Sequence, residues 1–345
     1  MALIYRILLC LSMLLGAAVM LECSPPSTLP GVESSGSPSV SFVDAPRRSG
    51  KEPVLILLPA SVHTQEVWQS LRDELMTSFD VVTRTVASNT TADNVKQEVD
   101  TVRPRCVVLI GNISMNLYSR YQKDNAGPYP PALVLMASFL EEQRALLQNT
   151  TGIAYEIPGI TTFVKLRSFI YRPVQRVGVI HRPLFADYVN KQRKLAAVEQ
   201  VELVPVQVGD EPGPYQIRRA LARLTRQDNV DAIWVLNDNV LLKPDLIAKG
   251  WLTVLHKNPL PVVVGVGSLV DVRLHFGSFA MLPDHAALGM QAANIIFKLS
   301  EEGWDASKAP VELPLSVQSV VDLPWARQHL QFREDALERI DRIVQ

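Results

Sequence analysis

Between residues 176 and 289 the chain alternates short apolar runs with amphipathic stretches, and this alternation restricts the fold more than any other feature. The runs RVGVIH, VELVPVQV, AIWVL and PVVVGV predict buried strands at 176–181, 201–208, 232–236 and 261–266. Apolar residues at helical spacing predict helices at 185–200, 217–225 and 241–255. Nearly continuous apolar strands that alternate with helices are typical of a parallel sheet covered on both faces. Such sheets bind ligands beyond the carboxyl ends of their strands.

The first half of the chain repeats this pattern. Strands are predicted at 54–58, 80–86, 106–110 and 131–136, and helices at 63–79 and 91–102. Two such units predict an α/β protein of two Rossmann-like lobes with parallel sheets, a hinge and a ligand cleft between the lobes. We expect the first lobe at 53–165, with about 280–310 returning to it, and the second lobe at 166–279. Residues 311–345 are expected to form a C-terminal strand and an amphipathic helix.

The N-terminal residues have the pattern of an export signal. Arg6 precedes the apolar run 7–21, which is short for a membrane span and is followed by Ser, Pro and Gly. We therefore expect a signal peptide at 1–23 and a flexible linker at 24–52. Cys23 is a second candidate boundary, as in a lipoprotein, although Glu22 stands where a small residue is usual. Secretion, lipidation at Cys23 and a retained membrane anchor remain open.

Composition argues against several classes of function. The net charge is −1 and no basic stripe is visible, so nucleic acid is not the expected partner. The six histidines lack metal-ligand spacing, and Gly265-Val266-Gly267 lacks the third glycine of a dinucleotide loop, so neither a metal nor a cofactor is expected. No serine lies in a G-x-S-x-G motif. We therefore expect a ligand-binding protein that has no catalytic residues and is not an enzyme.

Polar residues that follow the predicted strands are the candidate ligand-binding residues. Because the carboxyl ends of parallel strands gather at one edge of a sheet, these side chains are expected to face one cleft. Asp238 would pair with a cationic group of the ligand. The candidates are Ser61, Asn112, Ser114, Ser138, Arg182, Asn237, Asp238 and Ser268.

Several segments together resemble the ABC-transporter substrate-binding protein family with a type I periplasmic-binding-protein fold. Residues 149–153 (NTTGI) are similar to its N-[IV]-T-G-V element, and 176–183 (RVGVIHRP) to its R-V-G-V-L-Y-N-P strand. Residues 230–239 (VDAIWVLNDN) resemble V-D-A-I-Y-V-P-T-D-N, and 288–293 (LGMQAA) resemble a helix start of the form L-G-x-x-A-A. The resemblance implies a periplasmic or secreted monomer that carries a small molecule, such as an amino acid or a related compound, to an ABC permease.

The chain departs from the family pattern in segments on the ligand side, so the family's ligands cannot be assigned to it. One departure is the end of the first strand, Pro59-Ala60-Ser61. Residues 116–131 are expected to form a long loop whose tyrosines, Tyr118, Tyr121 and Tyr129, either close over a ligand or pack on the lobe. Two alternatives remain: a secreted ligand-sensing subunit for a signalling partner, and an extracytoplasmic enzyme on the same kind of sheet.

Overall fold

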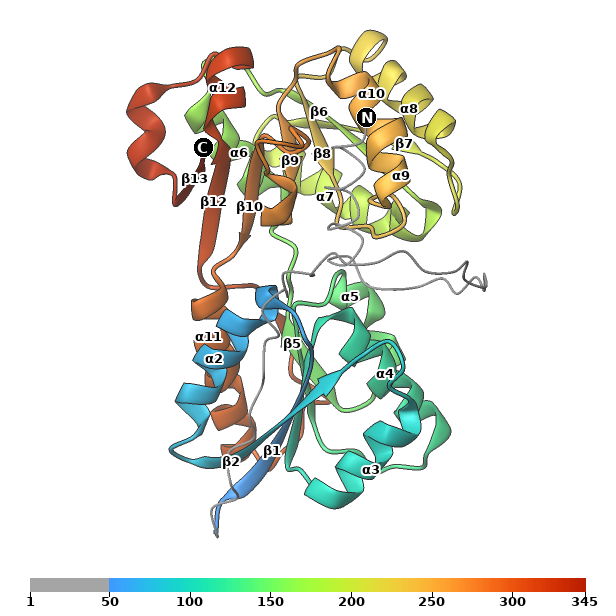
Figure 1. The fold of residues 1–345 in the computed structure, drawn as a ribbon, viewed down its shortest axis with the longest axis vertical. Coiled ribbons are helices and arrows are strands. Elements are labelled where there is room, and N and C mark those ends of the chain that lie inside the picture. Colours follow the sequence, from blue (N-terminus) through green and yellow to red (C-terminus); the bar gives the residue numbers. More distant parts are fainter. Residues whose placement is uncertain (1–49) are drawn as a thin grey trace, which may run out of the picture.

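The computed structural model describes residues 50–345, which form two lobes, each a sheet with helices on both faces (Figure 1). The expected signal peptide, Cys23 and nearly all of the expected linker lie outside the described residues. Within residues 50–345 no helix is both long and apolar enough to cross a membrane.

The first lobe has a parallel six-stranded sheet in the order β11-β5-β4-β3-β1-β2. Its central strand β1 contains the run Val54–Leu58, in which every residue is at most 1% exposed. Alternate side chains of this run enter hydrophobic clusters on opposite faces of the sheet, which explains why the run is apolar throughout. The strands are β1 (Glu52–Pro59), β2 (Phe79–Val86), β3 (Cys106–Ile110), β4 (Ala132–Leu135), β5 (Thr150–Ile153) and β11 (Val311–Glu312).

Helices α2 and α11 cover one face of this sheet, and α3 and α4 cover the other. Close packing of α2 on α11 requires Gly289, because a Cβ there would lie 2.7 Å from the Val67 carbonyl oxygen. The N-terminus of α3 has a capping box in which Thr91 and Asn94 satisfy each other's backbone N–H groups. The helices of this lobe are α2 (Val62–Leu75), α3 (Ala92–Val102), α4 (Gly111–Asp124), α5 (Leu140–Gln143) and α11 (His285–Glu301).

The second lobe has a seven-stranded sheet in the order β13-β12-β10-β9-β8-β6-β7. β12 pairs with β10 in antiparallel fashion, whereas β6 to β10 run parallel to one another. The strands are β6 (Arg176–His181), β7 (Glu202–Gln207), β8 (Ala232–Val235), β9 (Val262–Val264), β10 (Phe279–Pro283), β12 (Val317–Asp322) and β13 (Arg342–Val344). The helices are α6 (Gly159–Phe169), α7 (Ala186–Val198), α8 (Pro214–Arg226), α9 (Pro244–Leu246), α10 (Leu252–Leu255) and α12 (Leu323–His329), with a π-helical turn at Ile247–Trp251.

Three segments cross between the lobes, at residues 154–158, at Asp284 and at residues 313–316. The first crossing leaves the carboxyl end of β5, and the second leaves the carboxyl end of β10. Because the neighbouring strands run parallel to these two, the carboxyl edge of each sheet faces the other lobe (Figure 1). The first crossing precedes the expected boundary at residue 165, since α6 packs in the second lobe through Phe163, Leu166 and Phe169.

The expected long loop at 116–131 is wrong, because α4 occupies residues 111–124. Tyr118 and Tyr121 lie on this helix and are buried in the core of the first lobe. They therefore pack on the lobe and do not close over a ligand. Tyr129 follows the helix and donates its hydroxyl hydrogen to the Gln122 carbonyl. Sequence reasoning missed the helix because it begins directly at the strand end, without a side-chain cap.

Candidate functional site

The candidate residues of the first lobe have different local roles. Ser61 caps α2, with its hydroxyl oxygen accepting from the His63 N–H at 3.2 Å. Asn112 joins two strand ends, because its side-chain oxygen accepts from the Ser138 N–H at 2.9 Å. Ser114 lies inside α4 and is fully buried, and its hydroxyl has no hydrogen-bond partner among residues 50–345. Ser61, Asn112 and Ser138 thus lie at the edge that faces the second lobe, whereas Ser114 lies within the core.

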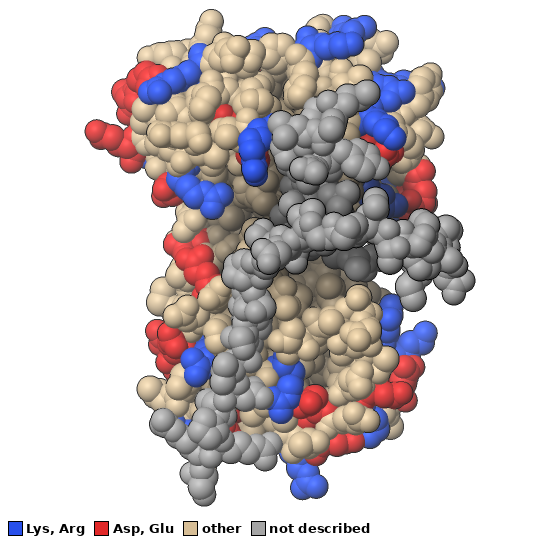
Figure 2. Space-filling model, viewed as in Figure 1, with Lys and Arg blue, Asp and Glu red and all other residues tan. Residues whose placement is uncertain are grey.

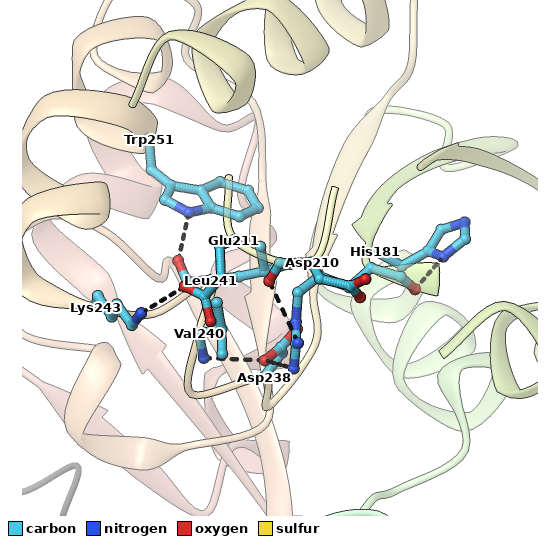
Figure 3. Close-up of polar contacts among 9 residues, drawn as sticks. His181, Asp210, Glu211, Asp238, Val240, Leu241, Lys243 and Trp251 are labelled. Carbon is cyan, nitrogen blue, oxygen red and sulfur yellow. Dashed lines mark hydrogen bonds and ion pairs between the residues drawn. The ribbon is translucent and has the colours of Figure 1, made fainter. Parts of the chain in front are cut away.

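In the second lobe Arg182 and Asp238 form an ion pair with two hydrogen bonds (Figure 3). Arg182 Nε lies 2.6 Å from Asp238 Oδ2, and Nη2 lies 2.9 Å from Oδ1. The Asp238 side chain is only 1% exposed, and that of Arg182 is 14% exposed. Hydrogen bonding to this carboxylate raises the pKa of the Arg182 guanidinium. The paired Asp238 is therefore not the free carboxylate that the sequence led us to expect opposite a ligand.

Further bonds join this ion pair to the neighbouring loops (Figure 3). Asp238 Oδ1 also accepts from the Val240 N–H at 3.0 Å, and Arg182 Nη1 lies 3.4 Å from the Asp210 carbonyl oxygen. Lys243 binds Glu211 at 2.9 Å on the same rim. The loops that follow β6, β7 and β8 are thereby connected, and we call residues 182, 210, 211, 238 and 243 the ionic rim.

The other two candidates of the second lobe lie apart from each other. Ser268 lies in a 3₁₀ turn, Gly267–Leu269, after β9. Asn237 follows β8, is 8% exposed and lines a small internal pocket. Among the eight candidates, Asn237 is the one that contacts this pocket.

The pocket lies where the first crossing segment meets the second lobe. It has a free volume of about 20 Å³, and its walls are mainly aromatic and aliphatic. The polar residues of its lining are Glu156, Thr162, Tyr188 and Asn237. Its lining also includes Phe139, Ile157, Trp234, Val235, Leu236, Val264, Gly265 and Met281.

Phe139 places a first-lobe side chain in the core of the second lobe. It is 3% exposed, and its ring centroid lies 4.2 Å from that of Phe185 and 5.0 Å from that of Tyr188. Its backbone has φ near 54°, a left-handed conformation that is uncommon for a bulky residue. The Phe139 N–H donates to Glu156 Oε2 at 2.8 Å, so the carboxylate holds this strained turn in place.

Glu156, in the first crossing segment, has a strongly perturbed pKa. Burial raises the pKa of its carboxyl to about 7, and the hydrogen bonds from Phe139 and Asn237 only partly offset this. No positively charged side chain among residues 50–345 contacts it. Perturbed groups of this kind cluster at functional sites.

Glu156, Tyr188, Phe139 and Trp234 did not stand out in the sequence. The four residues come from different elements, and only the folded chain brings them together. The one local signal was a carboxylate in the otherwise apolar crossing segment that follows the NTTGI element. A charged residue in such a segment requires a partner or a shifted pKa.

A second polar cluster joins two of the crossing segments. The Tyr155 hydroxyl lies 3.1 Å from His285 Nε2, and His285 Nδ1 lies 3.8 Å from Glu66. Burial lowers the pKa of His285, so the ring favours its neutral form. The described residues contain no group of three or more His, Cys, Asp or Glu side chains arranged to hold a metal ion.

A surface groove lies on the outer flank of the second lobe, between β7 and α8. Its free volume is about 970 Å³, and the arginines Arg219, Arg223 and Arg226 line one side. None of the three crossing segments contributes a residue to this groove. On the face shown in Figure 2, basic and acidic side chains are interspersed, without a large patch of one sign.

Solved structures with the same architecture are known. A substrate-binding protein with adhesive properties from Clostridium difficile, in a ligand-free, open form, matches with a TM-score of 0.62 and 13% identity, over 85% of this chain and 99% of that chain. The ABC domain from Streptococcus pneumoniae in complex with L-Trp matches with a TM-score of 0.56 and 15% identity, over 85% and 100%. A conserved domain protein from Vibrio cholerae matches with a TM-score of 0.55 and 18% identity, over 85% and 99%.

No protein-family model matches the chain, and no curated protein matches it. At such low identities the structural likeness establishes the fold alone. The predicted fold class is therefore confirmed: the chain has the two-lobed α/β fold of type I periplasmic binding proteins, which is also the fold of ABC-transporter substrate-binding proteins.

Proposed function

We propose that the protein is an extracytoplasmic solute-binding protein that captures a small molecule between its lobes and delivers it to an ABC permease. The observation that carries the proposal is the position of the pocket around Glu156. It lies beside the first crossing segment, at the carboxyl ends of β8 and β9, and ligands of open α/β sheets bind at such strand ends. Its polar groups are incompletely satisfied by the protein itself.

Several parts of the proposal extend beyond the fold. Export through the signal peptide at 1–23, with or without lipidation at Cys23, places the protein outside the cytoplasm. Amino acids and related small molecules are the first ligand class to test. We propose that the candidate residues Ser61, Asn112, Ser138, Arg182, Asn237 and Asp238, which follow strand ends, contact the ligand, and that Ser268 and the buried Ser114 contribute indirectly.

Ligand binding can be tested with a thermal-shift screen of amino acids, peptides, purines and organic acids. A ligand that binds only the folded state stabilises it by RT ln(1 + L/Kd), where L is the free ligand concentration, so the melting temperature rises once L exceeds Kd. Small-angle scattering with the best ligand should then show a smaller radius of gyration, because ligand contacts are completed as the lobes close. An unchanged scattering profile at saturation would contradict capture by closure.

Delivery to a permease needs a separate test. Uptake of the ligand by vesicles that contain the permease and ATPase encoded nearby should require this protein. If the neighbouring genes encode a sensor kinase, and ligand changes kinase activity without uptake, the alternative of a sensing subunit is favoured. Chemical change of the bound ligand would instead favour an enzyme.

A further inference from the structure

The size of the Glu156 pocket restricts what can enter it. Its free volume is about 20 Å³, whereas a cavity needs on the order of 10–15 Å³ by the same kind of measure to hold one water molecule. The pocket therefore admits one chemical group about as large as water, and not a whole ligand. An ammonium group, a hydroxyl group or water itself has this size.

The unmet hydrogen-bonding capacity of the pocket favours a donor. A carboxylate can accept about four hydrogen bonds. Glu156 accepts one good bond, from the Phe139 N–H at 2.8 Å, and a long one from Asn237 Nδ2 at 3.5 Å. The Tyr188 hydroxyl is buried and has no partner among the described residues, although buried hydroxyl groups nearly always have one.

The charge around the pocket favours a cation over a neutral donor. The Asn237 amide donates to Glu156, and the titratable groups that interact with it are Tyr155, Tyr188 and Glu142, none of which carries a positive charge. Lys191, three residues after Tyr188 on α7, is bound to Glu141 at 2.6 Å. The aromatic rings of Phe139, Tyr188 and Trp234 also attract a cation in their vicinity.

We infer that this pocket takes the primary ammonium group of the ligand, which donates to Glu156 and to the Tyr188 hydroxyl oxygen. The inference rests on the proposed function and adds the ligand's chemical class. The unused acceptor capacity of Glu156 and the Tyr188 hydroxyl can serve the N–H groups of an ammonium, and the remainder of the ligand extends toward the other lobe. A quaternary ammonium is excluded, because it has no N–H to donate and is too large for the space.

The test compares matched probes on the purified full chain. Calorimetry would measure binding of L-leucine, L-phenylalanine, benzylamine and butylamine, their N-trimethylated forms and the corresponding alcohols and carboxylic acids. We expect primary amines to bind and their trimethylated and hydroxyl counterparts to bind at least about 30-fold more weakly, the usual effect of losing a buried charge pair.

Variants then assign the effect to the pocket. Glu156→Gln keeps the shape of the side chain but removes its charge, and it should weaken the amine at least about 30-fold. Tyr188→Phe should weaken it about fivefold to tenfold. Glu142→Gln is the matched control, because this acid lies nearby without lining the pocket, and it should change affinity less than about threefold.

A second readout follows proton release. Since the Glu156 carboxyl is partly protonated near pH 7, binding of an ammonium should release protons at pH 6–7 and few at pH 8.5, and Glu156→Gln should abolish the release. If the wild type binds a neutral or anionic probe and Glu156→Gln leaves its affinity unchanged, the inference is overturned while the proposed function stands. Binding of no probe, here or in the wider screen, overturns both.

Discussion

Replacing Asp238 with alanine should destabilise the second lobe by about 3 kcal/mol. The substitution removes both hydrogen bonds from Arg182 and the one from the Val240 N–H. Breaking a buried ion pair by removing one partner costs about 3–5 kcal/mol, because the other charge is left without compensation. The Arg182 side chain is 14% exposed and also reaches the Asp210 carbonyl, so it can turn partly toward water. This places the expected loss near the lower end of the range.

Urea unfolding followed by far-UV circular dichroism and tryptophan fluorescence would measure the loss. A destabilisation of this size shifts the unfolding midpoint by about 1 M urea. The pair between Arg327 and Glu334 is the matched control. It has the same two-bond geometry, with both contacts at 2.8 Å, but its side chains are 53% and 58% exposed. Glu334→Ala should therefore leave the midpoint unchanged within error.

The outcome separates two roles for Asp238. If this carboxylate holds the ionic rim together, Asp238→Ala lowers stability in the absence of any ligand, and Asp238→Asn lowers it less because one oxygen acceptor remains. If Asp238 instead pairs with a ligand cation, the alanine variant loses binding and keeps its stability. A midpoint that moves no more than in Glu334→Ala would refute the structural role.

Three further predictions concern packing and pH. Phe139→Ala should cost about 3–5 kcal/mol in urea unfolding, because its buried ring bridges the lobes, and a loss below about 1 kcal/mol would contradict that role. Gly152→Ala should prevent stable folding, as its Cβ would lie 2.3 Å from the Val134 carbonyl oxygen, whereas Gly209→Ala, with open space around it, should be tolerated. Glu156 has a folded-state pKa near 7, above its ordinary 4.5, so stability should fall by up to about 3 kcal/mol as pH rises from 4.5 to 8, and Glu156→Gln should flatten this slope.

The architecture of the chain could be predicted because each buried strand is a continuous apolar run that is recognisable from its own sequence. The run VLILL is apolar throughout, since both faces of its sheet are covered, and the same holds for AIWVL in the second lobe. Helix α4 was missed because its first turn, Gly111–Ser114, consists of weak helix formers and has no capping side chain. Its stability comes from burial of Tyr118 and Met115, which is a tertiary effect.

The site was less predictable, because its contacts join residues that are distant in the sequence. Arg182 and Asp238 were both assigned to strand ends, but their pairing depends on β6 and β8 being neighbours in the sheet. The sequence of neither segment indicates that β6 and β8 are adjacent in the sheet. The Glu156 pocket depends on Phe139 entering the second lobe, and no periodicity indicates an interlobe contact of this kind.

The position of the pocket beside the hinge has a consequence for the order of binding steps. The Tyr155–His285 contact joins the first two crossing segments, and Asp284 is bonded to Ser316 in the third through its backbone N–H at 3.0 Å. Pro158 restricts the backbone of the first crossing further. Rotation about such connected segments moves nearby groups little and distant groups far. We therefore expect the Glu156 pocket to be nearly complete in the open protein, so that the ammonium group of the ligand binds there first. The ionic rim would reach the ligand only when the lobes close.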